Sequence, residues 1–150
     1  MRSSFPYWLF GVAWSAALAA LCLTSALAGT PPVPSLAPSD SSPEREISVN
    51  IYARQFEPDT LTLTAGQKTK LVFHNLDVEL HAFVPVDLLV GVNVNISGNG
   101  APEFGKNGFK RVIIPSQGNV EIRFVPQRPG VYPFYCDMPG HEMRATIVVE

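Results

Sequence analysis

The part of the chain that follows residue 45 is predicted to be an all-β domain, either a β-sandwich or a barrel. Short apolar or alternating runs recur about eight times in it, at the spacing of strands. The chain also contains fourteen prolines and eleven glycines, which favour turns over long helices. No window shows the apolar stripe of an amphipathic helix. These observations exclude a helical domain and predict strands joined by tight turns.

The first 28 residues have the pattern of a secretory signal peptide. Arg2 precedes an uncharged apolar run over residues 8–27, and residues 26–28 form a small-x-small cleavage site. The apolar run approaches the length of about 20 residues that a membrane-spanning helix needs, so an uncleaved membrane anchor is the alternative. We expect cleavage after Ala28 and export to the periplasm or another extracytoplasmic space.

Residues 29–45 are rich in proline and serine and lack apolar periodicity, which predicts a flexible linker. The folded domain is then expected over residues 46–150, a length that can bury one modest core. Of the two cysteines, only Cys136 lies outside the predicted signal peptide. Its thiol therefore forms an intermolecular link, packs as an inert core residue or binds a metal.

The predicted strands follow one another from residue 47 to residue 149. The first alternates Ile47, Val49 and Ile51 with polar residues, and the second alternates leucines with threonines before a turn at Ala65–Gly66. The others cover residues 70–73, 80–84, 112–114, 120–124, 131–135 and 145–149. Residues 85–110 interrupt this rhythm, because the Gly- and Asn-rich stretch 91–108 predicts a long loop.

The loop before the last predicted strand carries the most distinctive chemistry of the sequence. Cys136, His141 and two methionines, Met138 and Met143, lie within it. A thiolate, an imidazole and a thioether form a soft donor set, which suits copper in a trigonal His₂Cys site with a weak axial methionine. The loop supplies one imidazole, so the second must come from elsewhere in the chain.

The candidate for the second imidazole is His81. It lies on a short apolar strand, where a neutral ring is favoured. The remaining histidine, His74, is expected at the surface near a strand end. His81 is therefore the candidate that would join Cys136 and His141.

These segments resemble the cupredoxin family of blue copper proteins. The matching residues are Phe56–Leu61, Ala65–Gly66, Asn75–Phe83, Pro129–Cys136, Pro139–His141 and Thr146–Val149. The resemblance covers nearly the whole domain from residue 46 on, and it implies a Greek-key β-sandwich with one copper ion at one end. It implies His81 and His141 as the imidazole ligands and Cys136 as the thiolate ligand.

The axial ligand departs from the family pattern. In the family, two or more residues separate the loop histidine from the axial methionine, whereas only Glu142 separates His141 from Met143. Met143 is the candidate for this position. Met138, Glu142 and the lack of any axial protein ligand are the alternatives.

We expect an electron carrier rather than an enzyme, with copper cycling between Cu(I) and Cu(II) and redox proteins as partners. Copper storage, delivery or sensing is the alternative, and a sandwich that has lost its metal is a third hypothesis. Three histidines are too few for a trinuclear copper centre, and the single loop cysteine excludes a binuclear one. A net charge of −2 without a basic cluster argues against nucleic-acid binding. We expect a monomer.

Overall fold

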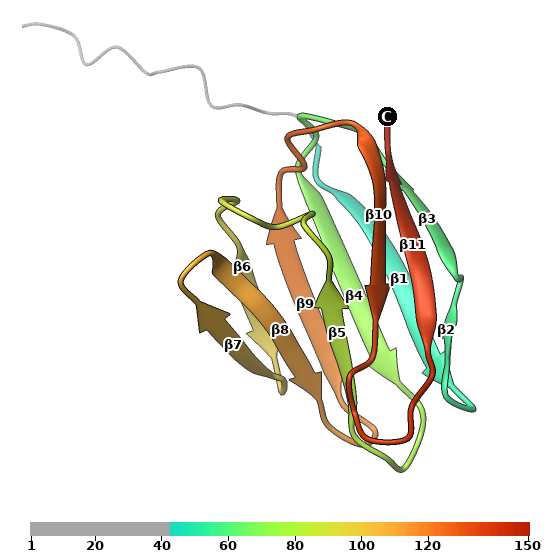
Figure 1. The fold of residues 1–150 in the computed structure, drawn as a ribbon. Helices are drawn as coiled ribbons and strands as arrows, with labels where there is room; N and C mark the ends of the chain where they lie inside the picture. The colour runs from blue at the N-terminus through green and yellow to red at the C-terminus, as the bar shows by residue number, and fades with distance from the viewer. Residues whose placement is uncertain (1–42) are drawn as a thin grey trace, which may run out of the picture. The chain divides into compact units, whose positions relative to one another are not determined.

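Residues 43–150 are described by the computed structural model, and they form two packed β-sheets (Figure 1). The predicted signal peptide and its alternative, a membrane anchor, lie outside the described residues, as does most of the predicted linker. Within the described part of the chain, no helix has the length and apolar character needed to cross a membrane.

All eight predicted strands are present among the eleven that the structure describes. The strands are β1 (Arg45–Tyr52), β2 (Gln55–Glu57), β3 (Thr60–Leu63), β4 (Thr69–Asn75), β5 (His81–Pro85), β6 (Asn95–Gly98), β7 (Ala101–Gly105), β8 (Gly108–Ile114), β9 (Asn119–Phe124), β10 (Gly130–Tyr135) and β11 (Arg144–Val149). The predicted β-sandwich is therefore confirmed.

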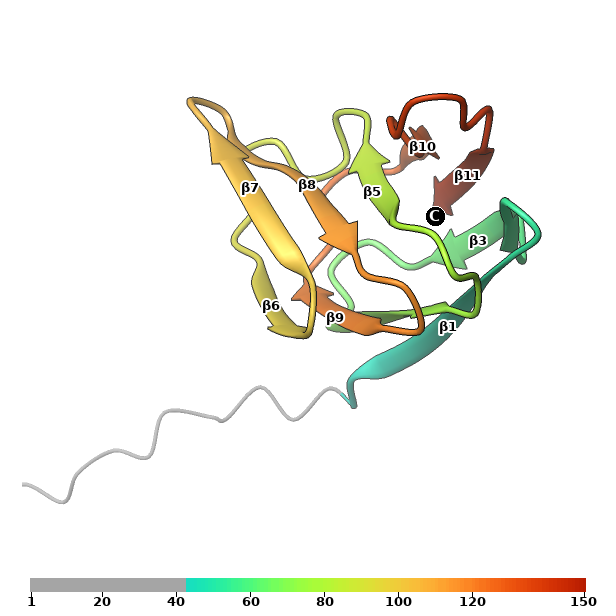
Figure 2. The ribbon, with the colours of Figure 1, turned by 90° about the horizontal axis from the view of Figure 1, so that it is seen from below.

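Both sheets mix parallel and antiparallel pairs. One sheet has the order β2-β1-β4-β9-β6, and the other has the order β3-β11-β10-β5-β8-β7. β1 runs parallel to β4 and β11 runs parallel to β3, while the remaining strand pairs are antiparallel. In Figure 2 the two layers are seen from below, with β5, β7 and β8 on one side and β1, β6 and β9 on the other.

Four phenylalanines join the two sheets near the centre of the core. Phe73 of β4 lies 4.6 Å from Phe83 of β5 between ring centroids, and Phe83 lies 5.2 Å from Phe134 of β10. Phe56 of β2 packs on Phe134 at 4.9 Å. Aromatic pairs of this kind contribute about 0.5–1.5 kcal/mol beyond the burial of their surface. They fix β5, which carries His81, and β10, which ends directly before Cys136.

The structure differs from the sequence prediction in the stretch 91–108. This stretch contains the edge strands β6 and β7 rather than one long loop. β6 pairs with β9 and β7 pairs with β8, and most of their residues are exposed. An edge strand with solvent on most sides needs no apolar alternation, because its pairing partner supplies its hydrogen bonds. The three-residue strand β2 was missing from the sequence prediction because a single buried apolar residue, Phe56, is too short a pattern to indicate a strand.

Candidate metal centre

Three side chains meet at one end of the sandwich, where the β4–β5 loop and the β10–β11 loop both lie (Figure 1). The possible ligand atoms of His81, Cys136 and His141 are all within 4.8 Å of one another. Cys136 Sγ lies 3.4 Å from Nδ1 of His141 and 4.0 Å from Nδ1 of His81. Both rings thus turn the same nitrogen, Nδ1, towards the thiol.

His81 is held in a buried position at the start of β5. Its side chain is fully buried, and its Nε2 lies 2.9 Å from Oδ2 of Asp77. Burial lowers the pKa of His81, because the charged ring loses its hydration, although the bond to Asp77 acts in the opposite direction. The neutral ring that this favours is the form that binds a metal.

Cys136 follows β10 directly and lies in the core. The backbone N–H of Ala82 donates to its Sγ at 3.3 Å, which ties the cysteine to the strand of His81. Its own N–H donates to the carbonyl of Met143 at 3.2 Å and closes the loop between the two residues. A thiolate at this position would accept the Ala82 N–H as a charge-assisted hydrogen bond.

His141 is placed by a turn in the same loop. Its N–H donates to the carbonyl of Met138 at 3.0 Å, and Gly140 before it has a left-handed backbone with a φ of 77°. A residue with a side chain adopts that conformation only at a cost, so glycine suits this position. The His141 side chain is 7% exposed, and its Nε2 lies 3.2 Å from Oε2 of Glu79.

Two carboxylates, Asp77 and Glu79, complete the surroundings of the rings. Burial of Asp77 opposes its ionisation, but the N–H groups of Arg54 and Ala53 together with His81 outweigh this, and its pKa lies below the usual value. The Arg54 side chain lowers the pKa of Glu79. The sequence analysis missed both residues. Only their position in the sequence could have indicated them, since Asp77 and Glu79 lie four and two residues before His81, a candidate metal-binding histidine.

Other residues considered from the sequence lie around this cluster. Met143 is buried and precedes β11, and its backbone contacts Cys136. Met138 is partly buried against the core, whereas Glu142 is exposed. The axial role of Met143 stays a prediction. His74 lies on β4 opposite Asn119 and is not part of the cluster.

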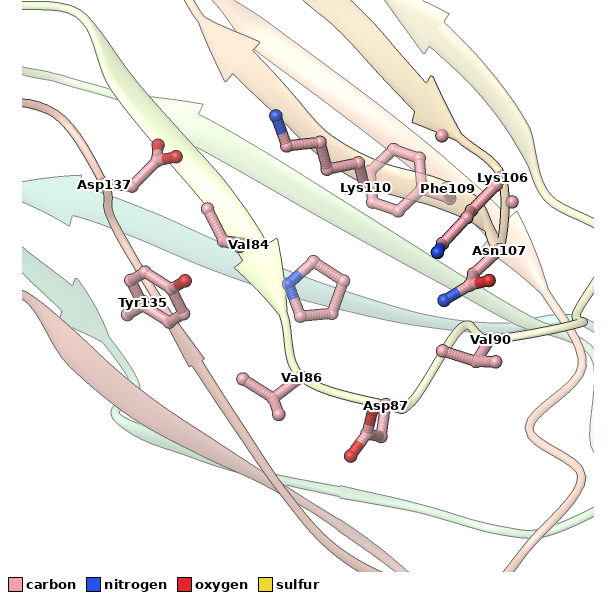
Figure 3. A pocket seen from close by; sticks show the side chains of 13 residues that line it. Val84, Val86, Asp87, Val90, Lys106, Asn107, Phe109, Lys110, Tyr135 and Asp137 are labelled. Carbon is pink, nitrogen blue, oxygen red and sulfur yellow. The ribbon is translucent and has the colours of Figure 1, made fainter.

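A surface pocket of about 430 Å³ lies beside the start of the β10–β11 loop (Figure 3). Tyr135 and Asp137, the two neighbours of Cys136 in the sequence, line one side of it. Lys106 and Lys110 of the β7–β8 hairpin lie on another side. None of the three clustered side chains lines the pocket. It therefore adjoins the cluster without opening onto it.

The donor set fits a soft or borderline metal ion. One thiol and two imidazoles suit copper or zinc, whereas calcium and magnesium prefer oxygen donors. Two features of the structure favour metal binding over simple packing. Both rings present Nδ1 to the sulfur, and both have a carboxylate at Nε2, which is the usual partner of a metal-binding imidazole.

Comparisons with known proteins show the family and the fold of the chain. A model of the cupredoxin-like domain family matches residues 11–149. Among solved structures, the chain is similar to auracyanin A, a "blue" copper protein from the green thermophilic photosynthetic bacterium Chloroflexus aurantiacus, with a TM-score of 0.54 and 19% identity over 72% of this chain and 100% of that one. It is also similar to auracyanin B, with a TM-score of 0.53 and 21% identity over 71% of this chain and 88% of that one. No curated protein matches the sequence.

Proposed function

Since the chain belongs to the cupredoxin-like domain family, we propose that it is a mononuclear copper protein that carries single electrons between redox partners. The observation that carries this proposal is the convergence of Cys136 with His81 and His141, each imidazole turning Nδ1 to the sulfur. We assign these three side chains as ligands and Met143 as the axial ligand. The copper-binding nature of the similar auracyanin A supports the choice of metal.

A bound copper ion would supply a one-electron couple between Cu(I) and Cu(II). The protein residues hold the donors in place for both states. The Ala82 N–H and the strands β5 and β10 fix the cysteine, and Asp77 and Glu79 fix the two rings. Because the donors are buried and already close together, little rearrangement would accompany electron flow.

The surface beside the site suits brief contacts with redox proteins. Leu76, Val78 and Leu80 of the β4–β5 loop are exposed by 51%, 84% and 51%, just before His81. Exposed apolar patches mark sites of contact with other proteins, and small interfaces are typical of weak, transient redox complexes. We propose that partners approach here and that the protein is a carrier rather than an enzyme.

The proposal keeps the domain organisation expected from the sequence. Residues 1–28 act as a signal peptide, residues 29–45 as a linker and residues 46–150 as the copper-binding domain. The protein then acts as a monomer in the periplasm or another extracytoplasmic space.

The visible spectrum after addition of Cu(II) tests the proposed function. We expect an intense thiolate-to-copper band that a reductant bleaches, together with fast electron exchange. Cys136→Ser should fold and lose this band, because a hydroxyl is a poor donor to copper at this site. A wild-type protein without the band would contradict the copper assignment. A band with slow electron exchange would favour copper storage, delivery or sensing instead.

A further inference from the structure

The turn between β1 and β2 has an unusual backbone. Its two central residues, Ala53 and Arg54, have φ values of 50° and 56°, although neither is glycine. Tyr52 pairs with Gln55 across the turn, so the hairpin is a two-residue one. Positive φ at both positions is typical of a type I′ turn, which normally contains Gly, Asn or Asp there. The hydrogen bonds of this turn explain why Ala53 and Arg54 keep the left-handed conformation.

One set of contacts connects the turn to His81. The backbone N–H groups of Ala53 and Arg54 donate to Oδ1 and Oδ2 of Asp77 at 2.9 Å and 3.0 Å. Oδ2 of Asp77 also lies 2.9 Å from Nε2 of His81. The left-handed backbone points both N–H groups at one carboxylate, and that carboxylate then meets the ring.

A second set of contacts connects the same turn to His141. The Arg54 guanidinium donates to both oxygens of Glu79, from Nε at 2.8 Å and from Nη2 at 2.6 Å. Such a bidentate pair fixes the plane of the carboxylate as well as its position. Oε2 of Glu79 lies 3.2 Å from Nε2 of His141.

We propose that the β1–β2 turn, residues 53–54, positions both imidazoles of the candidate metal centre through Asp77 and Glu79. Asp77 accepts the Nε2–H of His81, and Glu79 places its carboxylate in ion-pair contact with Nε2 of His141, so that Nδ1 of each ring is left as the free donor facing Cys136. Asp77 and Glu79 are positioning residues, since they act through the rings. Arg54 and Ala53 in turn hold these two carboxylates in place.

The arrangement also has a consequence for the metal, and this part rests on the proposed function. A carboxylate at Nε2 makes the imidazole a stronger donor, which favours the more highly charged ion, Cu(II), over Cu(I). Asp77 has the larger effect, because its side chain is 15% exposed and that of Glu79 is 41% exposed. Water screens the more exposed carboxylate.

The first experiment needs no metal. In ¹⁵N-labelled metal-free protein at about pH 8, where imidazoles are mostly neutral, long-range ¹H–¹⁵N spectra distinguish Nε2–H from Nδ1–H rings. We expect Nε2–H for both His81 and His141. Asp77→Asn should change the tautomer of His81 alone, and Glu79→Gln should change that of His141 alone.

A matched control separates hydrogen bonding from charge. Glu57→Gln removes one negative charge from the pocket that Arg54 also lines, yet Glu57 is not a partner of either ring. It should leave both tautomers as in the wild type. Wild-type rings in mixed tautomers, or variants that change neither ring, would overturn the proposal. If Asp77→Asn fails to fold, the wild-type spectra and the surface variant Glu79→Gln decide the question.

The second experiment uses the copper-loaded protein. Asp77→Asn should lower Cu(II) affinity by about 10–100-fold and raise the reduction potential. Glu79→Gln should raise the potential less, and Glu57→Gln should leave it nearly unchanged. An equal rise in all three variants would reveal a general charge effect and overturn the inference. A wild-type protein without a copper band would instead contradict the proposed function, while the tautomers of the metal-free protein would still decide this inference.

Discussion

Asn75 is the residue that organises the loop carrying both carboxylates. It is 1% exposed at the end of β4, and its Nδ2 donates to the carbonyls of Glu79 at 2.8 Å and Pro115 at 2.9 Å. Its Oδ1 accepts the N–H of Asp77 at 3.0 Å. A single buried amide thus joins the start of the loop to both of its acidic residues and to the segment after β8.

We predict that Asn75→Ala destabilises the metal-free protein by about 2–4 kcal/mol, because several backbone groups lose their partner in a buried place. Urea unfolding followed by circular dichroism measures this loss. Asn50→Ala, on an exposed position of β1, should change the free energy of unfolding by less than about 0.5 kcal/mol. Equal losses in the two variants would show that the buried amide has no special role.

His81 and His74 should differ in their importance for copper binding. His81→Gly should remove the copper band, and added imidazole should restore it in part by filling the space left by the ring. His74→Gly should keep the band, since His74 lies on β4 outside the cluster. The visible spectra of the two copper-loaded variants provide the measurement. Loss of the band in His74→Gly alone would mean that the wrong histidine was assigned.

Residue types and spacing made His81 the candidate to join Cys136 and His141, because a soft donor set on one loop requires an imidazole from elsewhere. The resemblance to the cupredoxins then implied all three as ligands. The same reasoning could not find Asp77 and Glu79. Their roles depend on a turn more than twenty residues earlier in the chain, whose N–H groups and arginine side chain reach them only in the folded protein. Hydrogen bonds between segments that are distant in the sequence produce no recognisable sequence pattern.

At the scale of elements, the connection between β6 and β7 shows why these strands escaped the sequence analysis. The Gly- and Asn-rich composition that predicts a loop is needed here for close packing. A side chain at Gly100 would collide with Val120 of β9 and would lie 2.8 Å from Cγ2 of Val112 on β8. Glycine at this position lets the chain pass close to both sheets. Whether a glycine indicates a loop or close packing therefore depends on tertiary contacts.

This close packing leads to a third prediction. Gly100→Ala should destabilise the domain by about 1–3 kcal/mol, because the added methyl group overpacks the space between two valines. Gly105→Ala is the matched control, since a Cβ there would meet no atom within 4 Å. Thermal unfolding of the two variants beside the wild type tests the difference. A Gly100→Ala protein as stable as Gly105→Ala would show that the chain can move aside at no cost.

In the molecule as a whole, the pattern of apolar residues determines the β-sandwich, and ion pairs hold the strands at the edges of the sheets. The eight strands that bury alternating or continuous apolar residues were predictable, since each must turn one face to the core. The edges are held partly by ion pairs that no pattern reveals. Arg111 of β8 binds Glu103 of β7 and also Asp137 next to Cys136, at 2.7 Å in both cases. The ion pair with Asp137 thereby connects the β7–β8 hairpin to the β10–β11 loop.

These ion pairs predict how the stability of the whole metal-free protein depends on pH. Hydrogen bonding to Arg111 lowers the pKa of Glu103 from its ordinary value, and hydrogen bonding to Arg123 does the same to the pKa of Glu121. A carboxyl group with a lower pKa in the folded state stabilises that state fully above its unfolded pKa. Its contribution is lost as the pH falls through the folded pKa. The free energy of unfolding should therefore decrease as the pH drops below about 4.5.

Variants of one ion pair test this assignment. Glu103→Gln cannot lose a proton, so its unfolding free energy should decrease less on acidification than that of the wild type. Arg111→Gln should show the same smaller decrease, because Glu103 then lacks the partner that lowers its pKa. Urea unfolding between about pH 3 and pH 7 covers the range in which the carboxyl groups titrate. A wild-type dependence on pH in both variants would mean that Glu103 has the same pKa in the folded and unfolded chains, and the ion pair between Glu103 and Arg111 would then contribute nothing to stability.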